Sequence, residues 1–187
     1  GPRSLSPDMD GGALRRTVLA NLDALPHHVG LSNHMGSLLT SLPDSMDAVM
    51  EAIAPRGVYF LDSRTTPDSV AARRARAYAI PTVARDVFLD VVIDHRRIAA
   101  ALERAVRLAE ERGHAVAIGH PHPATLDVLE ARLPLLRKRI RLVPVSELVT
   151  PAAAPRWAQR PDANGAHPPV QARRGTGSGP AERSLGE

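Results

Sequence analysis

The sequence contains no cysteine, and aromatic residues make up only 3% of it. Without cysteine the protein can form neither disulfide bonds nor thiolate metal sites. No apolar run approaches the ~20 residues that a transmembrane helix needs, and the first residues lack the charged and apolar regions of a signal peptide. We therefore expect no transmembrane segment and no signal peptide within this chain.

Lysine is almost absent as well, because Lys138 is the only lysine among 24 basic residues. The formal net charge is +4, which by itself is compatible with nucleic-acid binding. However, the arginines alternate with acidic residues along residues 103–112, a pattern typical of a solvated helix face. We therefore expect no nucleic-acid partner.

The chain divides into two regions of different composition. With 187 residues it is long enough for one domain with a hydrophobic core. Beyond residue 149, proline, glycine, alanine and arginine dominate and the apolar periodicity ends. The sequence therefore predicts one folded domain over residues 1–149 and a disordered tail over residues 150–187.

Helical and strand-like patterns alternate along the first region. We predict helices over residues 11–25, 43–54, 67–78, 98–112 and 124–136, with Asp94 and Gly113 as caps of the fourth. Short apolar segments that favour strands lie at residues 29–31, 58–61, 82–84, 115–118 and 140–145. This alternation predicts an α/β protein with a parallel sheet and helical crossovers.

Polar clusters follow the predicted strands directly. They contain His34, Asp62 with Arg64, Asp86, and His120 with His122. In parallel α/β folds the chemistry gathers at the carboxyl ends of the strands. The position of these clusters is therefore the strongest indication of function that the residues alone provide.

The histidines suit the hydrolysis of an amide such as an N-acetyl group. This reaction needs an activated water, a base, an acid for the leaving amine and positive charge near the oxyanion. A divalent metal held by imidazoles supplies the first and the last of these. His120 and His122 flank Pro121, and such a pair is as often functional as structural, whereas a single loop histidine such as His34 is more often structural.

The acidic residues leave alternatives open. Arg64 could orient the Asp62 carboxylate or a substrate oxygen, or the two residues could form a structural ion pair at the end of a strand. Asp86 and Asp90 bracket an apolar Val-Phe-Leu run. Either one of them faces the site or both cap loops, and the sequence favours the second alternative.

Five motifs in order resemble the divergent polysaccharide deacetylase family. They are residues 31–37 (LSNHMGS), 59–66 (YFLDSRTT), 85–90 (RDVFLD), 117–125 (AIGHPHPAT) and 142–146 (LVPVS). The resemblance implies a distorted (β/α) barrel over residues 1–149. This barrel would be incomplete, because the family's first strands, with an Asp pair and a later histidine segment, have no counterpart in this sequence.

The resemblance also implies a function. It implies a metal-dependent hydrolase that removes N- or O-acetyl groups from an acetylated polysaccharide or a peptidoglycan-like substrate, in the periplasm or elsewhere outside the cytoplasmic membrane. The expected cofactor is a divalent metal, zinc first, which needs an Asp that is not in this chain. We therefore expect this fragment alone to be inactive.

The resemblance assigns roles to individual residues. His34 would be a metal ligand, and His120 would be the general acid, with His122 as its partner or as a ligand. Asp62 and Arg64 would line the same catalytic face. Asn33 and Asp86 would support these groups or contact the substrate.

Two other functions fit the same residues. The protein could be a non-catalytic envelope or carbohydrate-binding protein that retains the deacetylase fold, because a fold does not determine a function. It could also be a basic interaction protein that binds polyanions through its Arg-rich tail, with affinity that falls steeply as salt rises. We rank this last alternative lowest.

Overall fold

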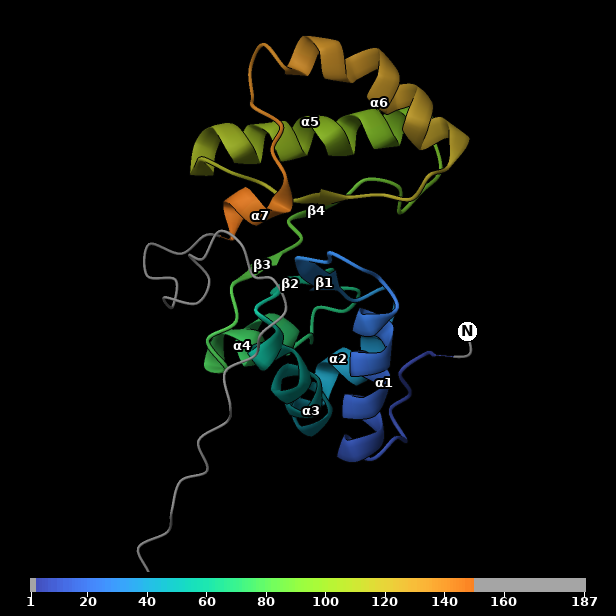
Figure 1. Ribbon diagram of the computed structural model, residues 1–187. Helices are drawn as coiled ribbons and strands as arrows, with labels where there is room; N and C mark the ends of the chain where they lie inside the picture. The colour runs from blue at the N-terminus through green and yellow to red at the C-terminus, as the bar shows by residue number, and fades with distance from the viewer. Residues whose placement is uncertain (1–2, 150–187) are drawn as a thin grey trace, which may run out of the picture.

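Two small parallel sheets organise the protein in the computed structural model, which describes residues 3–149 (Figure 1). The first sheet contains β1 (Gly30–Ser32), β2 (Tyr59–Asp62) and β3 (Thr82–Ala84), in that order. The second pairs β4 (Val87–Phe88) with β5 (Ala117–Ile118). Only Arg85 and Asp86 separate β3 from β4, so the two sheets follow one another along a single stretch of chain.

Helices connect the strands and lie in two groups. The first group contains α1 (Gly11–Asp23), α2 (Ser37–Ser41), α3 (Pro43–Ile53), the 3₁₀ turn η1 (Ala54–Arg56) and α4 (Ala71–Ala77). The second contains α5 (His95–Arg112), α6 (Pro123–Leu136) and the short α7 (Val145–Leu148). Figure 1 shows the first group beside β1–β3 and the second beside β4. No helix among the described residues is long and apolar enough to cross a membrane.

The first core forms because α1 and α3 bury their apolar faces against each other. Asp10 caps α1 by accepting a hydrogen bond from the Ala13 amide at 2.7 Å. Leu14, Val18 and Leu22 then recur at helical spacing and are buried. Figure 1 shows α1 and α3 close to each other, and their residues belong to one cluster that also contains Phe60 of β2.

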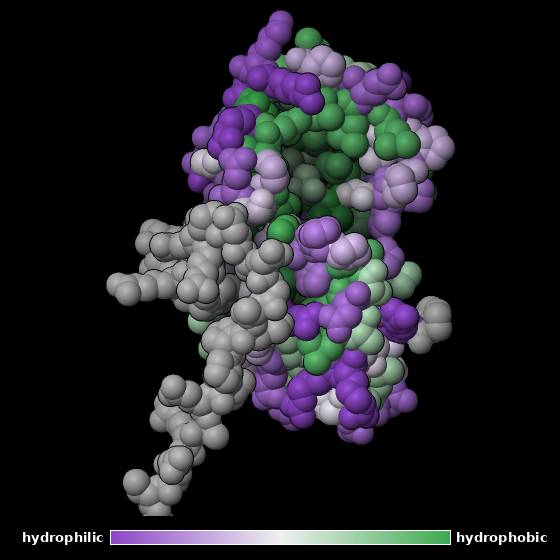
Figure 2. Space-filling view, viewed as in Figure 1, coloured by the Kyte–Doolittle hydropathy of each residue, from purple (hydrophilic) through white to green (hydrophobic). Residues whose placement is uncertain are grey.

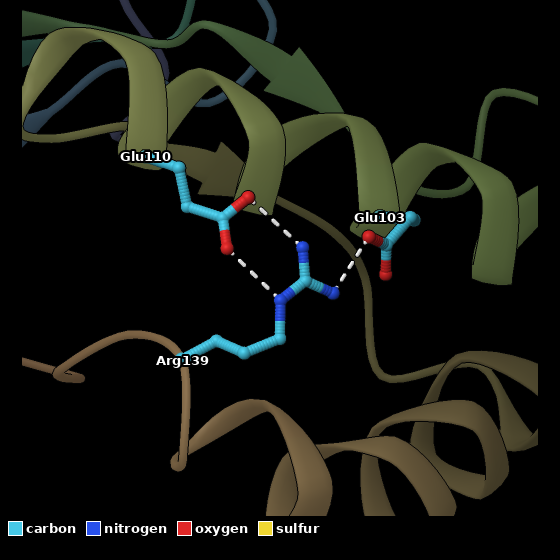
Figure 3. Close-up of polar contacts among 3 residues, drawn as sticks. All are labelled: Glu103, Glu110 and Arg139. Carbon is cyan, nitrogen blue, oxygen red and sulfur yellow. Dashed lines mark hydrogen bonds and ion pairs between the residues drawn. The ribbon is translucent and has the colours of Figure 1, made fainter.

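The second core lies between α5, α6 and β4. Asp94 caps α5 through the Arg97 amide at 2.9 Å, and Gly113 ends it in a left-handed conformation. Beyond α6, the guanidinium of Arg139 bonds to Glu110 through two nitrogens and to Glu103 through the third (Figure 3). The chain leaving α6 is therefore tied to the side of α5.

The two sheets are joined where β3 leads into β4. The Arg85 amide donates to the Asp62 carbonyl at 2.9 Å, and the Asp86 amide donates to the Val116 carbonyl at 2.8 Å. A third apolar cluster, which includes Val83 and Val116, packs across both sheets. The carboxyl ends of β2 and β3 therefore continue directly into the start of the second sheet.

Most of the predicted elements are confirmed. The α/β class, the parallel strands and the caps of α5 agree with the sequence. The helix predicted over residues 67–78 begins later, at Ala71, because the Val70 amide donates to the Thr40 carbonyl and Asp62 accepts the Ala72 amide. Helix α2 was not predicted, since its five residues directly follow the polar, glycine-containing segment 32–36 and are too few to show helical periodicity.

The strand predicted over residues 140–145 is wrong. Within the described part of the chain these residues form no strand. The Ile140 amide still bonds back to the Leu136 carbonyl of α6, and Pro144 has no amide hydrogen to donate to a neighbouring strand. Over residues 3–149 the sheets remain open. The predicted tail over residues 150–187 lies outside the described residues.

Candidate functional site

A buried carboxylate holds the imidazole of His120 in one orientation. Asp90 follows β4, its side chain is inaccessible to solvent, and its Oδ1 lies 3.1 Å from Nδ1 of His120. Its Oδ2 accepts hydrogen bonds from the His120 amide and, at 3.0 Å, from Oγ1 of Thr125 in α6. Because a carboxylate only accepts, Nδ1 carries the hydrogen and Nε2 is left for other chemistry.

The close approach of these two residues requires Gly119. A Cβ at this position would lie 3.2 Å from Oδ2 of Asp90 and 3.2 Å from Cβ of Leu89. Beyond the loop, α6 begins at Pro123, which suits a first helical position because its missing amide hydrogen would find no partner there. The glycine and the second proline of the Gly-His-Pro-His-Pro segment therefore suit the backbone conformation that places His120 against Asp90.

The charge of Asp90 is stabilised by its partners. Burial acts to raise the pKa of the Asp90 carboxyl, but the hydrogen bonds from the amide and ring of His120 and from Thr125 outweigh it. The pKa of Asp90 therefore lies below its usual value. A persistent negative charge at this position favours any imidazolium that forms on His120 during proton transfer.

Two further imidazoles lie beside this pair. The ring of His34, from the loop after β1, meets the His120 ring edge to face, with centroids 6.0 Å apart. The centroid of the His122 ring lies 5.6 Å from that of the His120 ring, and the centroid of the Phe88 ring lies 5.4 Å from it. The side chain of His120 is 40% exposed, so a ligand can reach it.

Part of this cluster could hold a metal ion. Asp90, His120 and His122 each offer one ligand atom, and these atoms lie within 4.8 Å of one another. Two nitrogens and one oxygen form a donor set that suits zinc, with a fourth position left for water. His34 is not part of this group of three, and its role as a ligand stays a prediction.

The Asp62 carboxylate accepts hydrogen bonds from the backbone of the segment that follows β2. It is buried, and it accepts hydrogen bonds from the Arg64 amide at 2.8 Å, the Ser69 hydroxyl at 2.9 Å and the Ala72 amide at 3.2 Å. These bonds shape the loop between β2 and α4. Among the described residues, no ion pair joins Asp62 to the guanidinium of Arg64.

Two residues in the loops that follow β1 and β2 have left-handed backbones. Met35 has φ 58° and Arg64 has φ 47°, conformations that residues with a Cβ rarely adopt. Between them, Asn33 accepts the Ser63 amide at 2.9 Å and donates to the Met35 carbonyl at 3.1 Å. Asn33 therefore ties the loop that carries His34 to the end of β2.

Arg85 is a site residue that the sequence analysis missed. Its guanidinium donates to the carbonyls of Ser63 and Arg64, each at 2.6 Å, and lies 5.0 Å from the centre of the Phe88 ring. Burial lowers the pKa of Arg85. The Arg85 side chain therefore links the loop after β2 to the Phe88 ring, which contacts His120.

The two acidic residues of the 85–90 motif have different contacts. Asp86 accepts the Val116 amide at 2.8 Å and lies 3.9 Å from the Arg112 guanidinium, so it helps to hold the start of β5. Asp90 is the carboxylate that contacts His120. In the sequence Asp86 and Asp90 stand at equivalent positions on either side of the Val-Phe-Leu run, so no residue pattern indicated which of them contacts His120.

These contacts define a parallel α/β protein with a carboxylate–imidazole site at the carboxyl ends of its strands. A family model described as divergent polysaccharide deacetylase matches residues 1–149. The chain belongs to this family, as the five motifs indicated.

Relatives agree with this assignment. The chain is 38% identical over 146 residues to the uncharacterized protein YibQ of Escherichia coli (strain K12), which is 78% of this chain and 46% of YibQ. It is 38% identical over 120 residues to an uncharacterized protein of Haemophilus influenzae, covering 64% of this chain and 43% of that protein. The chain thus spans less than half of these two relatives.

A solved structure has a related fold. The crystal structure of an uncharacterized protein from Agrobacterium tumefaciens C58 superposes with a TM-score of 0.75 at 23% identity. The match covers 80% of this chain and 61% of that chain. At this identity the likeness supports the fold alone.

Proposed function

We propose that this chain carries part of the site of a metal-dependent hydrolase. The enzyme would remove N- or O-acetyl groups from an acetylated cell-envelope polysaccharide or a peptidoglycan-like substrate, outside the cytoplasmic membrane. Family membership supports the carbohydrate substrate. The observation that carries the proposal is the buried Asp90 carboxylate on Nδ1 of His120, beside the imidazoles of His34 and His122.

His120 is the general acid in this proposal. With Nδ1–H directed at Asp90, Nε2 can deliver a proton to the amine or alkoxide that leaves the acetyl carbon. The negative charge of Asp90 stabilises the protonated ring before transfer, and Thr125 and Gly119 keep both groups in place. The sugar then leaves with the proton, and water supplies the new oxygen of acetate.

The metal ligands in this proposal are His34 and His122. Both oxygens of Asp90 already accept hydrogen bonds, so Asp90 suits the role of orienting His120 better than that of a ligand. As the family resemblance implies, a carboxylate from outside these 187 residues would complete the set. A bound divalent cation, zinc first, supplies the activated water and the positive charge at the oxyanion.

Asp62 and Arg64 are proposed to line the same face through the loop that they shape, with Asn33 holding His34. We also propose that the open sheets belong to a distorted (β/α) barrel whose first strands lie outside this sequence. The open sheets and the partial coverage of the relatives support this arrangement. A chain without those strands would lack catalytic activity.

The test uses the longest natural form of the protein. We expect it to bind a divalent metal and to release acetate from acetylated oligosaccharides, and a chelator should abolish the release. His34→Ala should weaken metal binding. His120→Ala should retain the metal and lower turnover by about a hundredfold or more.

His95→Ala is the matched control, because His95 is exposed at the start of α5 and pairs only with Asp127 in the described structure. His95→Ala should change neither metal binding nor turnover. Full metal binding by His34→Ala would exclude His34 as a ligand. Glycan binding with neither metal nor acetate release would instead identify a non-catalytic carbohydrate-binding protein.

A further inference from the structure

A large cavity opens directly beside His120. Its volume is about 780 Å³, and it lies between α5, α6 and the segment that leads from Arg139 to Leu148. Figure 2 shows a hollow lined by hydrophobic residues in the part of the molecule that contains α5 and α6. Cavities of about 300–1,000 Å³ are typical of small-molecule sites, so the size suits a ligand.

The walls of this cavity are mostly apolar. Helix α5 contributes Leu102, Val106 and Ala109, and helix α6 contributes Leu126, Leu129 and Leu133. Leu126 is 52% exposed although it stands next to Thr125, which bonds to Asp90. An apolar surface therefore continues from the His120–Asp90 pair into the space between the helices.

Most of the charged groups along the cavity already have partners. Arg139 is bonded to Glu110 and Glu103, Arg141 to Glu147, and Thr125 to Asp90, while His114 and His120 also border the space. A sugar in this space would find few free partners for its hydroxyl groups, and burying them unpaired is costly. A hydrocarbon chain carries no such cost, and it gains from leaving water.

We propose that this cavity binds an acyl chain of the substrate, so that the site also removes acyl groups longer than acetyl from an acylated glycan. This inference rests on the proposed hydrolase and extends its substrate class beyond acetyl groups. Water adds to the scissile carbonyl carbon, and the bond from that carbon to the sugar nitrogen or oxygen breaks. The proton from His120 goes to the sugar, and the fatty acid leaves as its carboxylate.

Binding can be tested without catalysis. Hexanoate, octanoate and decanoate would be titrated into the 187-residue chain and followed by NMR, after circular dichroism has verified its helical content. We expect affinity to rise roughly threefold for each added methylene. Ala109→Phe should fill the cavity and weaken decanoate binding by at least about tenfold.

Ala100→Phe is the matched control. It makes the same change on the same helix nine residues earlier, about half a turn around the axis, and Ala100 does not line this cavity. It should leave decanoate binding unchanged. Should Ala109→Phe fail to fold, Leu126→Asn provides a milder change and should weaken decanoate binding by about threefold or more.

Catalysis separates this inference from the proposed function. In the longest natural form, turnover of 4-nitrophenyl esters should increase from acetate to decanoate, and Ala109→Phe should remove the increase while sparing the acetate ester. Chelator-sensitive release of acetate with no preference for long chains and no decanoate binding would overturn the acyl cavity but keep the hydrolase. Decanoate binding without hydrolysis of any ester would keep the cavity and overturn the hydrolase.

Discussion

The two helical regions on either side of the strand edge differ in how completely they are packed. In the region of α1–α4, Phe60, Leu14, Met46, Met50 and Ile53 are all fully buried. In the region of α5 and α6, Ile98 and Val106 are buried as completely, but a cavity of about 780 Å³ separates the helices from the chain that follows them. The first region is a closed scaffold, and the second has space for a ligand.

The same contrast applies to the buried carboxylates at the strand ends. Asp62 accepts two amides and one hydroxyl within its own loop. Asp90 accepts the amide and the ring of His120, and that ring is partly exposed. The position after a strand is therefore shared, but the partners decide whether a carboxylate orders a loop or orients a reactive group.

The largest expected effect comes from replacing a leucine by alanine in the first region, compared with the same replacement in the second. Leu14→Ala should lower the free energy of unfolding by about 2–5 kcal/mol, because its site in the closed core cannot collapse. Leu133→Ala should cost only about 1 kcal/mol, because Leu133 already borders the cavity. Urea denaturation of both variants measures the difference, and equal losses would contradict an open second core.

A smaller effect separates the two carboxylates. Asp62→Ala should lower the free energy of unfolding by about 2–3 kcal/mol, since it leaves buried amides of the β2–α4 loop without an acceptor. Its effect on turnover should follow from stability alone. Asp90→Asn should instead lower turnover in the longest natural form by about a hundredfold, because the wrong partner faces Nδ1 of His120.

Unfolding curves and rates of acetate release would be measured for both variants at a temperature where each is folded. Wild-type turnover by Asp90→Asn would show that Asp90 does not orient a catalytic group. A loss of turnover by folded Asp62→Ala as large as that of Asp90→Asn would place Asp62 in the chemistry as well.

The helices could be predicted from the sequence because their signals are local. Asp94 and Gly113 cap α5, and the spacing of Leu14, Val18 and Leu22 determines the buried face of α1. The prediction of a strand over residues 140–145 was wrong because strand pairing depends on residues distant in the sequence. An apolar run becomes a strand only where a neighbour accepts its hydrogen bonds, and Pro144 and the end of α6 work against that here.

The site could be predicted in part. The motifs drew attention to His34 and His120, and the structure brings their rings together. The choice of Asp90 over Asp86, and the contacts of Arg85, depend on how β5 and α6 meet β4, and no local pattern encodes that arrangement. Nor did any residue pattern indicate the cavity, because it lies between elements.

A still smaller change tests the packing behind the His120–Asp90 pair. Gly119→Ala should lower the free energy of unfolding by about 1 kcal/mol, because the added Cβ would press on Oδ2 of Asp90 and on Leu89. Turnover in the longest natural form should fall by about tenfold as the imidazole shifts. Urea denaturation and turnover rates would check the two effects, and wild-type rates would show that the pair tolerates this shift.

The smallest expected effect concerns the contacts of Arg139 with α5 (Figure 3). Arg139→Met should lower Tm by only about 1–3 °C at neutral pH, since exposed ion pairs contribute little. The hydrogen bonds from Arg139 lower the pKa of Glu110, so their stabilising effect is complete above the ordinary pKa of this carboxyl and disappears as pH falls through the lowered value. The Tm difference between the two proteins should therefore shrink in acid, and a difference that stays constant from about pH 7 to about pH 3 would mean that Arg139 stabilises the helix pair through its aliphatic stem.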